Sequence, residues 1–376
     1  MELRLPQPVA QVVHWEACVE PAFAALDDEL PACPSPNHGG SMRRTLCWAA
    51  VAVFAAVAPP GALAQALIVS GYAASEFEWN LTNPKTNTFD AQAFNLIVLG
   101  QLRGDVFAAA EIEYEHGGEE IALEYGYLAF TRWPFANIIA GKFLVPFGRF
   151  NSDLHPAWIN KIPGRPLPND AILPVAYSDV GVMVRGATPM GTSGRVTYDV
   201  WGTNGLAGNP GASIRALRDN LVDVDNNIAL GGRLGFVSRL GLDVGASAYN
   251  GTYNDSAALN LRIVGVDASY RRGALEVRGE WMSALQDTSS TDGVTKRGFY
   301  LQSSYLLNAW VEAAVRYSQV DFPTASGDKS RLSLGINLHP SDAAAFRFAY
   351  NINRETGSGV TQVKNDTFIA QFTVGF

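Results

Sequence analysis

The stretch DTFIAQFTVGF at residues 366–376 decides the fold. One set of its alternate positions is apolar: Phe368, Ala370, Phe372, Val374 and Phe376. The other set is mostly small or polar: Thr367, Gln371, Thr373 and Gly375, with Ile369 as the exception. Successive side chains of a β-strand point to opposite faces, so this segment would have one apolar and one polar face. Such a strand is typical of a membrane barrel, with lipid outside and water inside.

The same alternation recurs throughout the chain, clearly in 105–115, 275–285, 310–319, 329–339 and 345–354. A soluble sandwich would bury each apolar row against a second sheet, and the sequence offers no helices to cover these rows. We therefore expect an all-β fold, a closed antiparallel transmembrane β-barrel of about 16 strands. The expected segments are 68–79, 92–102, 104–115, 119–133, 135–143, 177–188, 194–203, 227–237, 240–250, 259–271, 274–285, 296–307, 309–320, 329–338, 343–354 and 366–376. Ambiguous registers in 68–79, 119–133 and 259–271 predict β-bulges there.

The links between these segments alternate in length. Short links fall at 103–104, 133–134, 189–193, 238–239, 271–273, 308 and 339–342. Long links fall at 80–91, 144–176, 204–226, 251–258, 286–295, 321–328 and 355–365, and only the link 116–118 breaks the rule by being short. Outer-membrane barrels have short periplasmic turns and longer outer loops. With both termini periplasmic, we expect every long link on the outer side.

An export signal is expected before the first strand. Met42 is followed by Arg43 and Arg44, then by an apolar run to Val57 and by small residues at 62–64, which is the order of a secretory signal peptide. The predicted organisation is an upstream or disordered extension at 1–41, a signal peptide at 42–64 and an outer-membrane β-barrel at 65–376. The three cysteines, Cys18, Cys33 and Cys47, all precede the expected cleavage site, so the exported chain would need no disulfide chemistry.

Charge and motifs exclude several functions. The net charge of −8 argues against nucleic-acid binding, which depends on cations that neutralise phosphates. The sequence has no G-x-S-x-G and no H-E-x-x-H, so we expect no catalytic residues and no cofactor. A group of acidic and amide residues in one long link lacks the spacing of a calcium loop and is better explained by Asx turns, so no metal site is expected: Asp219, Asp223, Asp225 and Asn227.

Two segments resemble known protein families. The terminal Phe376, with apolar residues at alternate positions before it, resembles the signal read by the bacterial outer-membrane assembly machinery. The run GKFLVPFGRFN at 141–151 is similar to segments of the phosphate-selective porin group and related porin-like proteins. In trimeric general porins the third outer loop folds inward and narrows the channel, and 144–176 is the third long link here. The resemblance therefore implies an inward third loop and a homotrimer.

Charged residues are expected at two places in such a channel. The third loop and its approach would form a locally positive constriction from Lys142, Arg149, Lys161 and Arg165, against Asp153 and Asp170. Acids in the lumen are expected on one side of the barrel: Glu111, Glu113, Glu115, Glu120 and Glu124. Basic residues are expected on the other: Arg185, Arg233, Arg278, Arg316, Arg331 and Arg347. Facing charges of this kind set pore selectivity. The alternatives are a loop that only packs by its prolines and lumen charges that only pair with neighbours.

The sequence therefore predicts a porin in the outer membrane of a Gram-negative bacterium. It would pass small polar solutes or anions by diffusion, although the acidic net charge argues against specificity for phosphate. Its expected partners are outer-membrane lipid, the assembly machinery, and two further copies of itself. The alternatives are a barrel enzyme, which would need a histidine beside a nucleophile or paired carboxylates, and a structural or adhesion barrel.

Overall fold

The computed structural model describes residues 67–80, 87–133, 135–173, 176–209, 213–217, 222–223, 225–254, 258–289, 291–322, 328–356 and 362–376. The predicted extension and signal peptide, 1–41 and 42–64, lie outside the described residues. Among the described residues, no helix combines the length and the apolar character needed to cross a membrane.

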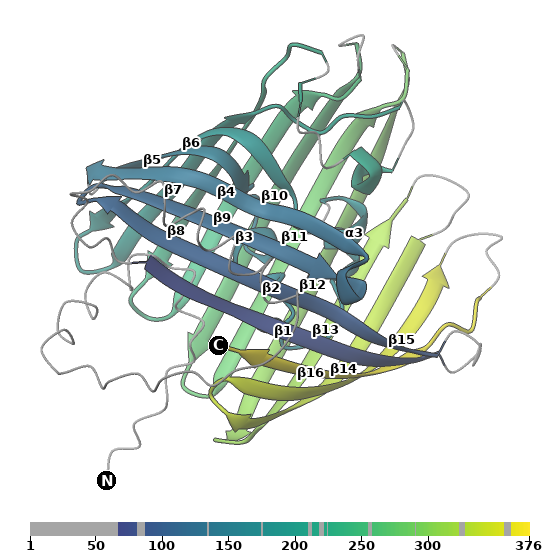
Figure 1. Cartoon of the computed structure of the whole chain (residues 1–376). Coiled ribbons are helices and arrows are strands. Elements are labelled where there is room, and N and C mark those ends of the chain that lie inside the picture. Colours follow the sequence, from purple (N-terminus) through teal and green to yellow (C-terminus); the bar gives the residue numbers. More distant parts are fainter. Residues whose placement is uncertain are drawn as a thin grey trace, which may run out of the picture. The chain divides into compact units, whose positions relative to one another are not determined.

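Sixteen strands form one closed antiparallel sheet, in which each strand pairs with its neighbours in sequence and β1 pairs with β16 (Figure 1). The strands are β1 (Leu67–Asn80), β2 (Thr88–Arg103), β3 (Val106–Glu115), β4 (Glu120–Trp133), β5 (Ala136–Leu144), β6 (Ser178–Met190), β7 (Gly194–Thr203), β8 (Ala229–Ser238), β9 (Leu242–Thr252), β10 (Asn260–Arg272), β11 (Leu275–Asp287), β12 (Gly293–Asn308), β13 (Val311–Asp321), β14 (Asp328–Ser341), β15 (Ala344–Thr356) and β16 (Thr367–Gly375). The predicted barrel and its strand number are confirmed. Both ends of every predicted segment lie within four residues of the ends of the corresponding strand.

The two faces of each strand differ as the alternation predicts. On β11, Trp281 is 40% exposed, whereas Arg278 and Glu280 on the other face are buried. Exposed Leu, Val, Ile and Phe side chains occupy one face of nearly every strand, and that face is the outer wall. The opposite rows line the lumen. An apolar outer wall around a polar interior suits a protein that has lipid outside.

Two of the three expected bulges are present. The register shifts between Ala74 and Glu76 on β1, and Glu124 of β4 is the extra residue opposite the step from Glu111 to Ile112. The expectation of a bulge in 259–271 is wrong, because β10 pairs with β9 and β11 without a shift in register. Regular alternation of buried and exposed side chains along β10 explains the even register.

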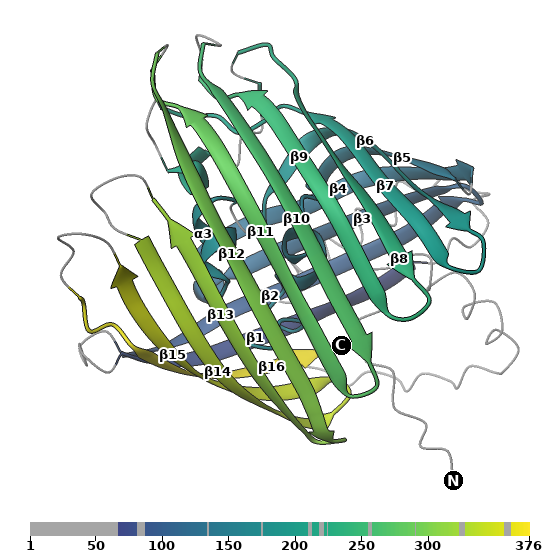
Figure 2. The ribbon, with the colours of Figure 1, turned by 180° about the vertical axis from the view of Figure 1, so that it is seen from behind.

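The two ends of the barrel differ in their links. Tight turns join β8 to β9, β10 to β11 and β12 to β13 at one end, which we call the short-turn end (Figure 2). The other end, the long-loop end, has the extended links. The exceptional short link is a single 3-10 turn, η3 (His116–Gly118). The link between β5 and β6 contains a π-helical turn, η4 (Phe150–Leu154), and the helix α3 (Leu167–Ala171).

Closure of the ring joins the two ends of the described chain. The Gly71 amide donates to the Phe376 carbonyl (3.0 Å), and the Phe376 amide donates to the Gly71 carbonyl (2.9 Å). Gly71 must be glycine, because a Cβ there would lie 2.2 Å from the Asn95 carbonyl oxygen and 2.7 Å from the Phe376 ring. The Phe376 ring stacks on Phe94 of β2, with ring centroids 5.9 Å apart.

Candidate functional site

The link between β5 and β6 turns into the barrel, and we call residues 145–173 and 176–177 the inward loop. Its two ends are held together by Asn151. The Asn151 amide nitrogen donates to the carbonyls of Val145 (2.8 Å) and Tyr177 (3.0 Å), and its oxygen accepts from the Tyr177 amide (2.9 Å). Asn151 is buried, so these bonds replace water for three backbone groups. One side chain thus fixes the base from which the loop projects.

Apolar side chains of the inward loop fill recesses in the lumen wall. A Cβ on Gly265 of β10 would lie 2.9 Å from Phe147, and one on Gly375 of β16 would lie 2.9 Å from Trp158. Ile162, fully buried, packs with Ala314 of β13 and Ala349 of β15. Small residues in the lumen row therefore make room for the loop on well-separated strands. The sequence shows these small residues, but their partners in the loop could not be inferred from it.

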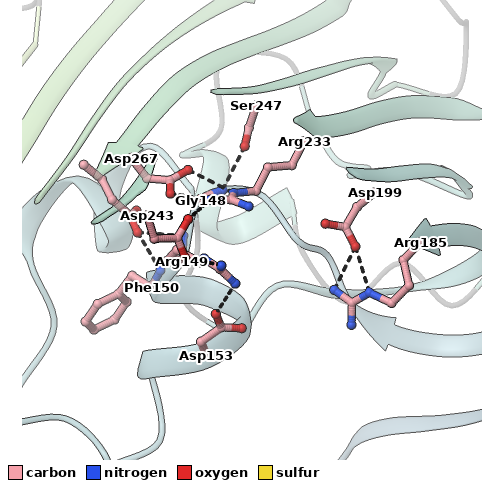
Figure 3. Close-up of polar contacts among 11 residues, drawn as sticks. Gly148, Arg149, Phe150, Asp153, Arg185, Asp199, Arg233, Asp243, Ser247 and Asp267 are labelled. Carbon is pink, nitrogen blue, oxygen red and sulfur yellow. Dashed lines mark hydrogen bonds and ion pairs between the residues drawn. The ribbon is translucent and has the colours of Figure 1, made fainter. Parts of the chain in front are cut away.

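The first polar anchor lies at the start of the loop, shown in Figure 3. One oxygen of Glu280 on β11 accepts from the amides of Arg149 (2.8 Å) and Phe150 (2.6 Å). The Gly148 amide donates to the Ser247 hydroxyl on β9 (3.1 Å). Backbone donors bound to a buried carboxylate give strong, charge-assisted hydrogen bonds. The loop backbone is therefore fixed to β9 and β11, away from the two strands that it connects.

The Arg149 side chain continues this anchor. Its guanidinium pairs with Asp153 in the loop (2.8 Å) and with Asp243 on β9. Burial opposes the charge, but Asp153 and Asp243 outweigh it and hold the pKa of Arg149 above its ordinary value. Arg233 of β8 pairs in turn with Asp267 (2.6 Å) and approaches Asp243 (3.6 Å). Arg149 is therefore compensated by acids, and its charge is not free for a solute.

The second anchor is Lys161, in the middle of the loop. Its ammonium pairs with Glu312 on β13 and with Glu276 on β11 (3.3 Å), and it donates to Ser304 on β12 (3.1 Å). Burial lowers the pKa of Lys161, and the neighbouring Glu312 opposes that effect. Farther along, Arg165 lies 3.9 Å from Glu115 on β3. The loop cations predicted from the sequence thus reach the wall on both sides.

Two lumen arginines bind the loop backbone. Arg316 of β13 donates to the Gly164 carbonyl (3.1 Å), and Arg347 of β15 donates to the Trp158 carbonyl (2.6 Å). Arg316 has no exposed surface and Arg347 is 4% exposed. The loop therefore covers both side chains, which the sequence predicted to face open water. Arg347 also donates to the Thr373 hydroxyl of β16 (2.5 Å).

His155 is buried between the loop and the acidic side of the barrel. Its Nδ1 donates to the Asn151 carbonyl (2.7 Å), and its Nε2 lies 3.5 Å from Glu124. Burial, followed by the charge of Arg165, lowers the pKa of His155 to about 4. The ring is therefore uncharged at neutral pH, so its contact with Glu124 is not an ion pair under those conditions.

The other predicted residues fall into separate groups. Asn95 donates to Glu111 (2.7 Å) and Glu113 (3.1 Å), which lie with Glu115 on the lumen row of β3. Two of the predicted arginines bind neighbouring strands: Arg185 pairs with Asp199 of β7 (2.8 Å), and Arg331 donates to Asn353 of β15 (2.7 Å). Arg278 pairs with Glu276, two positions away on its own strand, β11. Asp170, on α3, pairs with Arg215.

Lys142 does not join the inward loop. On β5 the buried side chains Asn137, Ile139 and Phe143 face the lumen, so Lys142 lies on the outer row. Its ammonium donates to the carbonyl of Leu123 (2.7 Å), beside the bulge of β4. The sequence alone points the wrong way here, because apolar Ile139 and Phe143 face the lumen, against the rule that apolar residues face lipid. Adjacent isoleucines at 138 and 139 obscured the alternation.

Sequence reasoning missed the carboxylates that receive the loop. Glu276, Glu280 and Glu312 lie on lumen rows, and their alternation with apolar residues is visible in the sequence. Their function as anchors depends on contacts between residues 115 or more positions apart, such as Lys161 and Glu276 or Phe150 and Glu280. Among the residues that the structure describes, no cluster of three His, Cys, Asp or Glu side chains could hold a metal ion.

Comparisons with known proteins agree with this architecture. No protein-family model matches the sequence. A protein of Aquifex aeolicus (strain VF5), described as uncharacterized, is 27% identical over 271 residues, which cover 63% of this chain. The match spans 61% of that relative's length.

Solved structures with the same architecture include three outer-membrane proteins. The anion-selective porin from Comamonas acidovorans has a TM-score of 0.59 at 12% identity, covering 83% of this chain and 100% of its own. Salmonella typhi OmpF has a TM-score of 0.59 at 14% identity, covering 82% and 97%. The outer-membrane channel DcaP of Acinetobacter baumannii has a TM-score of 0.56 at 9% identity, covering 83% and 97%. At these identities the likeness shows the fold.

Proposed function

We propose that this chain, which has the fold of the outer-membrane porins, forms a water-filled channel for passive diffusion of small polar or ionic solutes. The channel would lie in the outer membrane of a Gram-negative bacterium, with the inward loop as its constriction. The proposal assigns no catalytic residue and no cofactor. A closed sheet with an apolar outer wall and a polar lumen supports it, since such a wall can span lipid and enclose water.

One observation carries the proposal: the inward loop is bound to the lumen wall at widely spaced strands. Glu280 holds its start, Glu312 its middle, and Arg316 and Arg347 two of its carbonyls. A loop held by buried, charge-assisted bonds has a defined position, so it can fix the width of a passage. A loop that served only as an outer contact surface would gain nothing from these anchors.

Charges of the lumen would then act on solutes that pass the loop. Glu111, Glu113 and Glu115 lie on β3, while Arg316, Arg331 and Arg347 lie on β13–β15. We propose that the acids of β3 and Arg331, together with Arg165 and Asp153 of the loop, determine which ions pass. Arg316 and Arg347 lie beneath the loop and would act by holding it in place. Rings and ladders of charge have this effect in other channels. Lys142 is left out of this group because it lies on the outer row.

Conductance in planar lipid bilayers tests the channel directly. We expect stepwise insertions with ohmic current. Glu280→Ala should raise the single-channel conductance and its noise, because the amides of Arg149 and Phe150 lose their acceptor. The matched control is Glu119→Ala, which removes the same group from an exposed position in the link between β3 and β4. Silent bilayers with correctly folded protein would reject the channel and favour a barrel enzyme or a structural or adhesion barrel. Equal conductance of both variants and the parent would reject the loop constriction alone.

We also propose how the barrel enters the outer membrane and how its copies associate. The terminal Phe376 would serve as the signal for the outer-membrane assembly machinery, and the barrel would form a homotrimer surrounded by outer-membrane lipid. Phe376→Ala should lower the amount of folded protein in the outer-membrane fraction. Phe372→Ala is the control for lost aromatic packing, since Phe372 lies on the same row and contacts Phe346. Equal losses in both variants would argue against a specific signal, and a monomer on native gels would argue against the trimer.

A further inference from the structure

A cavity of about 400 Å³ opens at the long-loop end, between α3 and the ends of β12–β15. Five cationic side chains line it: Arg215, Lys296, Lys329, Arg331 and Arg354. Among the described residues of the lining, two are carboxylates, Asp170 and Glu355. This excess of positive charge contrasts with the net charge of −8 for the whole chain, so the cavity is a local exception. Its volume is within the usual range of small-molecule sites.

Both carboxylates of the cavity are already engaged. Asp170 pairs with Arg215. Glu355 stands directly opposite Lys329 across the β14–β15 pair, yet its oxygens accept from the Val363 amide (3.1 Å) and the Asn365 side chain (2.9 Å). The Glu355 carboxylate is therefore drawn toward the β15–β16 link and forms no ion pair with Lys329.

Three of the cations have only neutral partners or none. Lys296 donates to the Gln286 side-chain oxygen (3.0 Å), and the Nε of Arg331 donates to the Asn353 side-chain oxygen (2.7 Å). In the described part of the chain, no ion pair includes Lys296, Lys329 or Arg331. The other guanidinium N–H groups of Arg331 remain free for an anion, which they can hold with two parallel hydrogen bonds.

Spacing and lining indicate which anion would fit. Lys329 and Arg331 are two positions apart on the same row of β14, about 6.6 Å along the strand. Two separate negative charges on one solute could therefore meet one cation each. The rest of the lining is partly apolar, with Leu167 and Ala171 of α3, Val320 of β13, and Phe322 just after β13. Apolar walls suit a short carbon skeleton better than a bare inorganic ion.

The geometry points to a binding site for small organic anions with two negative charges, such as a dicarboxylate or a phosphate monoester. The inference rests on the proposed channel only for the route by which the solute leaves the site. Binding itself requires the folded barrel and the inward loop, because α3 forms one wall of the cavity. The site would concentrate dianionic solutes at the mouth of the channel, ahead of the constriction.

Chloride current across planar bilayers tests the site, with succinate and glucose 6-phosphate as the two probes and glucose as the neutral control. We expect each dianion to reduce the current at millimolar concentration when added at the long-loop end, and glucose to have no effect. Lys329→Gln and Arg331→Gln should each raise the half-blocking concentration by about tenfold, as expected for one charge-assisted contact. A response to only one probe would tell carboxylate from phosphate as the favoured group.

Arg262→Gln is the matched control. Arg262 lies near the long-loop end of β10, is exposed, and faces away from the lumen, so its loss removes the same charge from the outer wall. Calorimetric titration of the folded barrel with both probes measures binding without conduction. The site would be overturned, and the channel retained, if the channels conduct normally but neither probe blocks the current. The same result requires that neither probe binds the folded barrel at up to 100-fold above the expected concentration. Equal half-blocking concentrations in the parent, K329Q and R331Q would also overturn the site. If the bilayer stays silent while the folded barrel binds the probes tightly and Lys329→Gln weakens that binding, the channel is rejected and the site is retained.

Discussion

The guanidinium of Arg316 lies beneath the Gly164 carbonyl of the inward loop, with 3.1 Å between donor and acceptor. Arg316 has no exposed surface, and its Nε and Nη1 have no hydrogen-bond partner among the described residues. A buried charge with unpaired donors is costly to desolvate. Its single contact with the loop therefore does more for the position of the loop than for the stability of the barrel.

Arg316→Met should separate these two effects. Methionine fills a similar volume without a buried charge, so we expect the barrel to unfold at an equal or higher temperature, with a gain between zero and about 2 kcal/mol. The loop loses one anchor, so single-channel conductance should rise modestly. Heat-modified mobility on denaturing gels measures the unfolding temperature, and bilayer recording measures the single-channel conductance. A lower unfolding temperature would show that Arg316 stabilises the wall.

Removing the charge of Lys161 should change ion selectivity, whereas removing that of Lys142 should not. Lys161→Gln removes a positive charge from the lumen and leaves Glu312 without its lysine partner, so permeability should shift several-fold toward cations, although Glu276 keeps Arg278. Lys142→Gln removes the same charge from the outer row. Reversal potentials in a salt gradient measure both. If the two variants behave alike, the lumen assignment of Lys161 is wrong.

The recess at Gly375 should be sensitive to a single methyl group. A Cβ at this position would lie 2.9 Å from the Trp158 ring, so Gly375→Ala should displace the loop and cost about 1–3 kcal/mol. Gly104→Ala is the control, because a Cβ there meets nothing within 4 Å. Tryptophan fluorescence and thermal unfolding would report the change. If Gly375→Ala changes neither the fluorescence nor the unfolding temperature, Trp158 has room to move.

Acid should loosen the inward loop through His155. The pKa of this histidine falls from an ordinary 6.5 to about 4 on folding, first because of burial and then because of Arg165; Glu124 and Asp153 are the acids nearby. The released loop would therefore bind a proton more readily than the inserted loop. The stabilising contribution is complete above pH 6.5 and is lost progressively as the pH falls to about 4, by at most about 3 kcal/mol.

The measurement is limited proteolysis of the loop between pH 7 and pH 4. His155→Asn retains a donor for the Asn151 carbonyl but does not titrate, so its cleavage rate should be much less dependent on pH. The same acid response in parent and variant would assign the effect to other groups, with the carboxylates on β3 and β4 as the first candidates.

The wall of this protein could be predicted from sequence because its determinants are local. Each strand carries its own alternation, as Trp281 and Glu280 show on β11, and the alternating link lengths place the turns. The inward position of the loop was implied by the resemblance to trimeric general porins. Its anchors could not, because Phe150 and Glu280 are 130 positions apart and nothing local relates them. Lys142 shows the other limit, since one misjudged parity moves a side chain to the opposite face.

Closure of the ring also constrains how the protein can be made. The Ser70 hydroxyl donates to the Phe376 carbonyl although 306 positions separate them, so the seam joins the first strand of the barrel to its last strand. A nascent or truncated chain would expose two open sheet edges, which invite aggregation, and contacts this distant form slowly. The seam therefore makes closure depend on both edge strands at once, since neither β1 nor β16 is sealed against lipid until the other is in place.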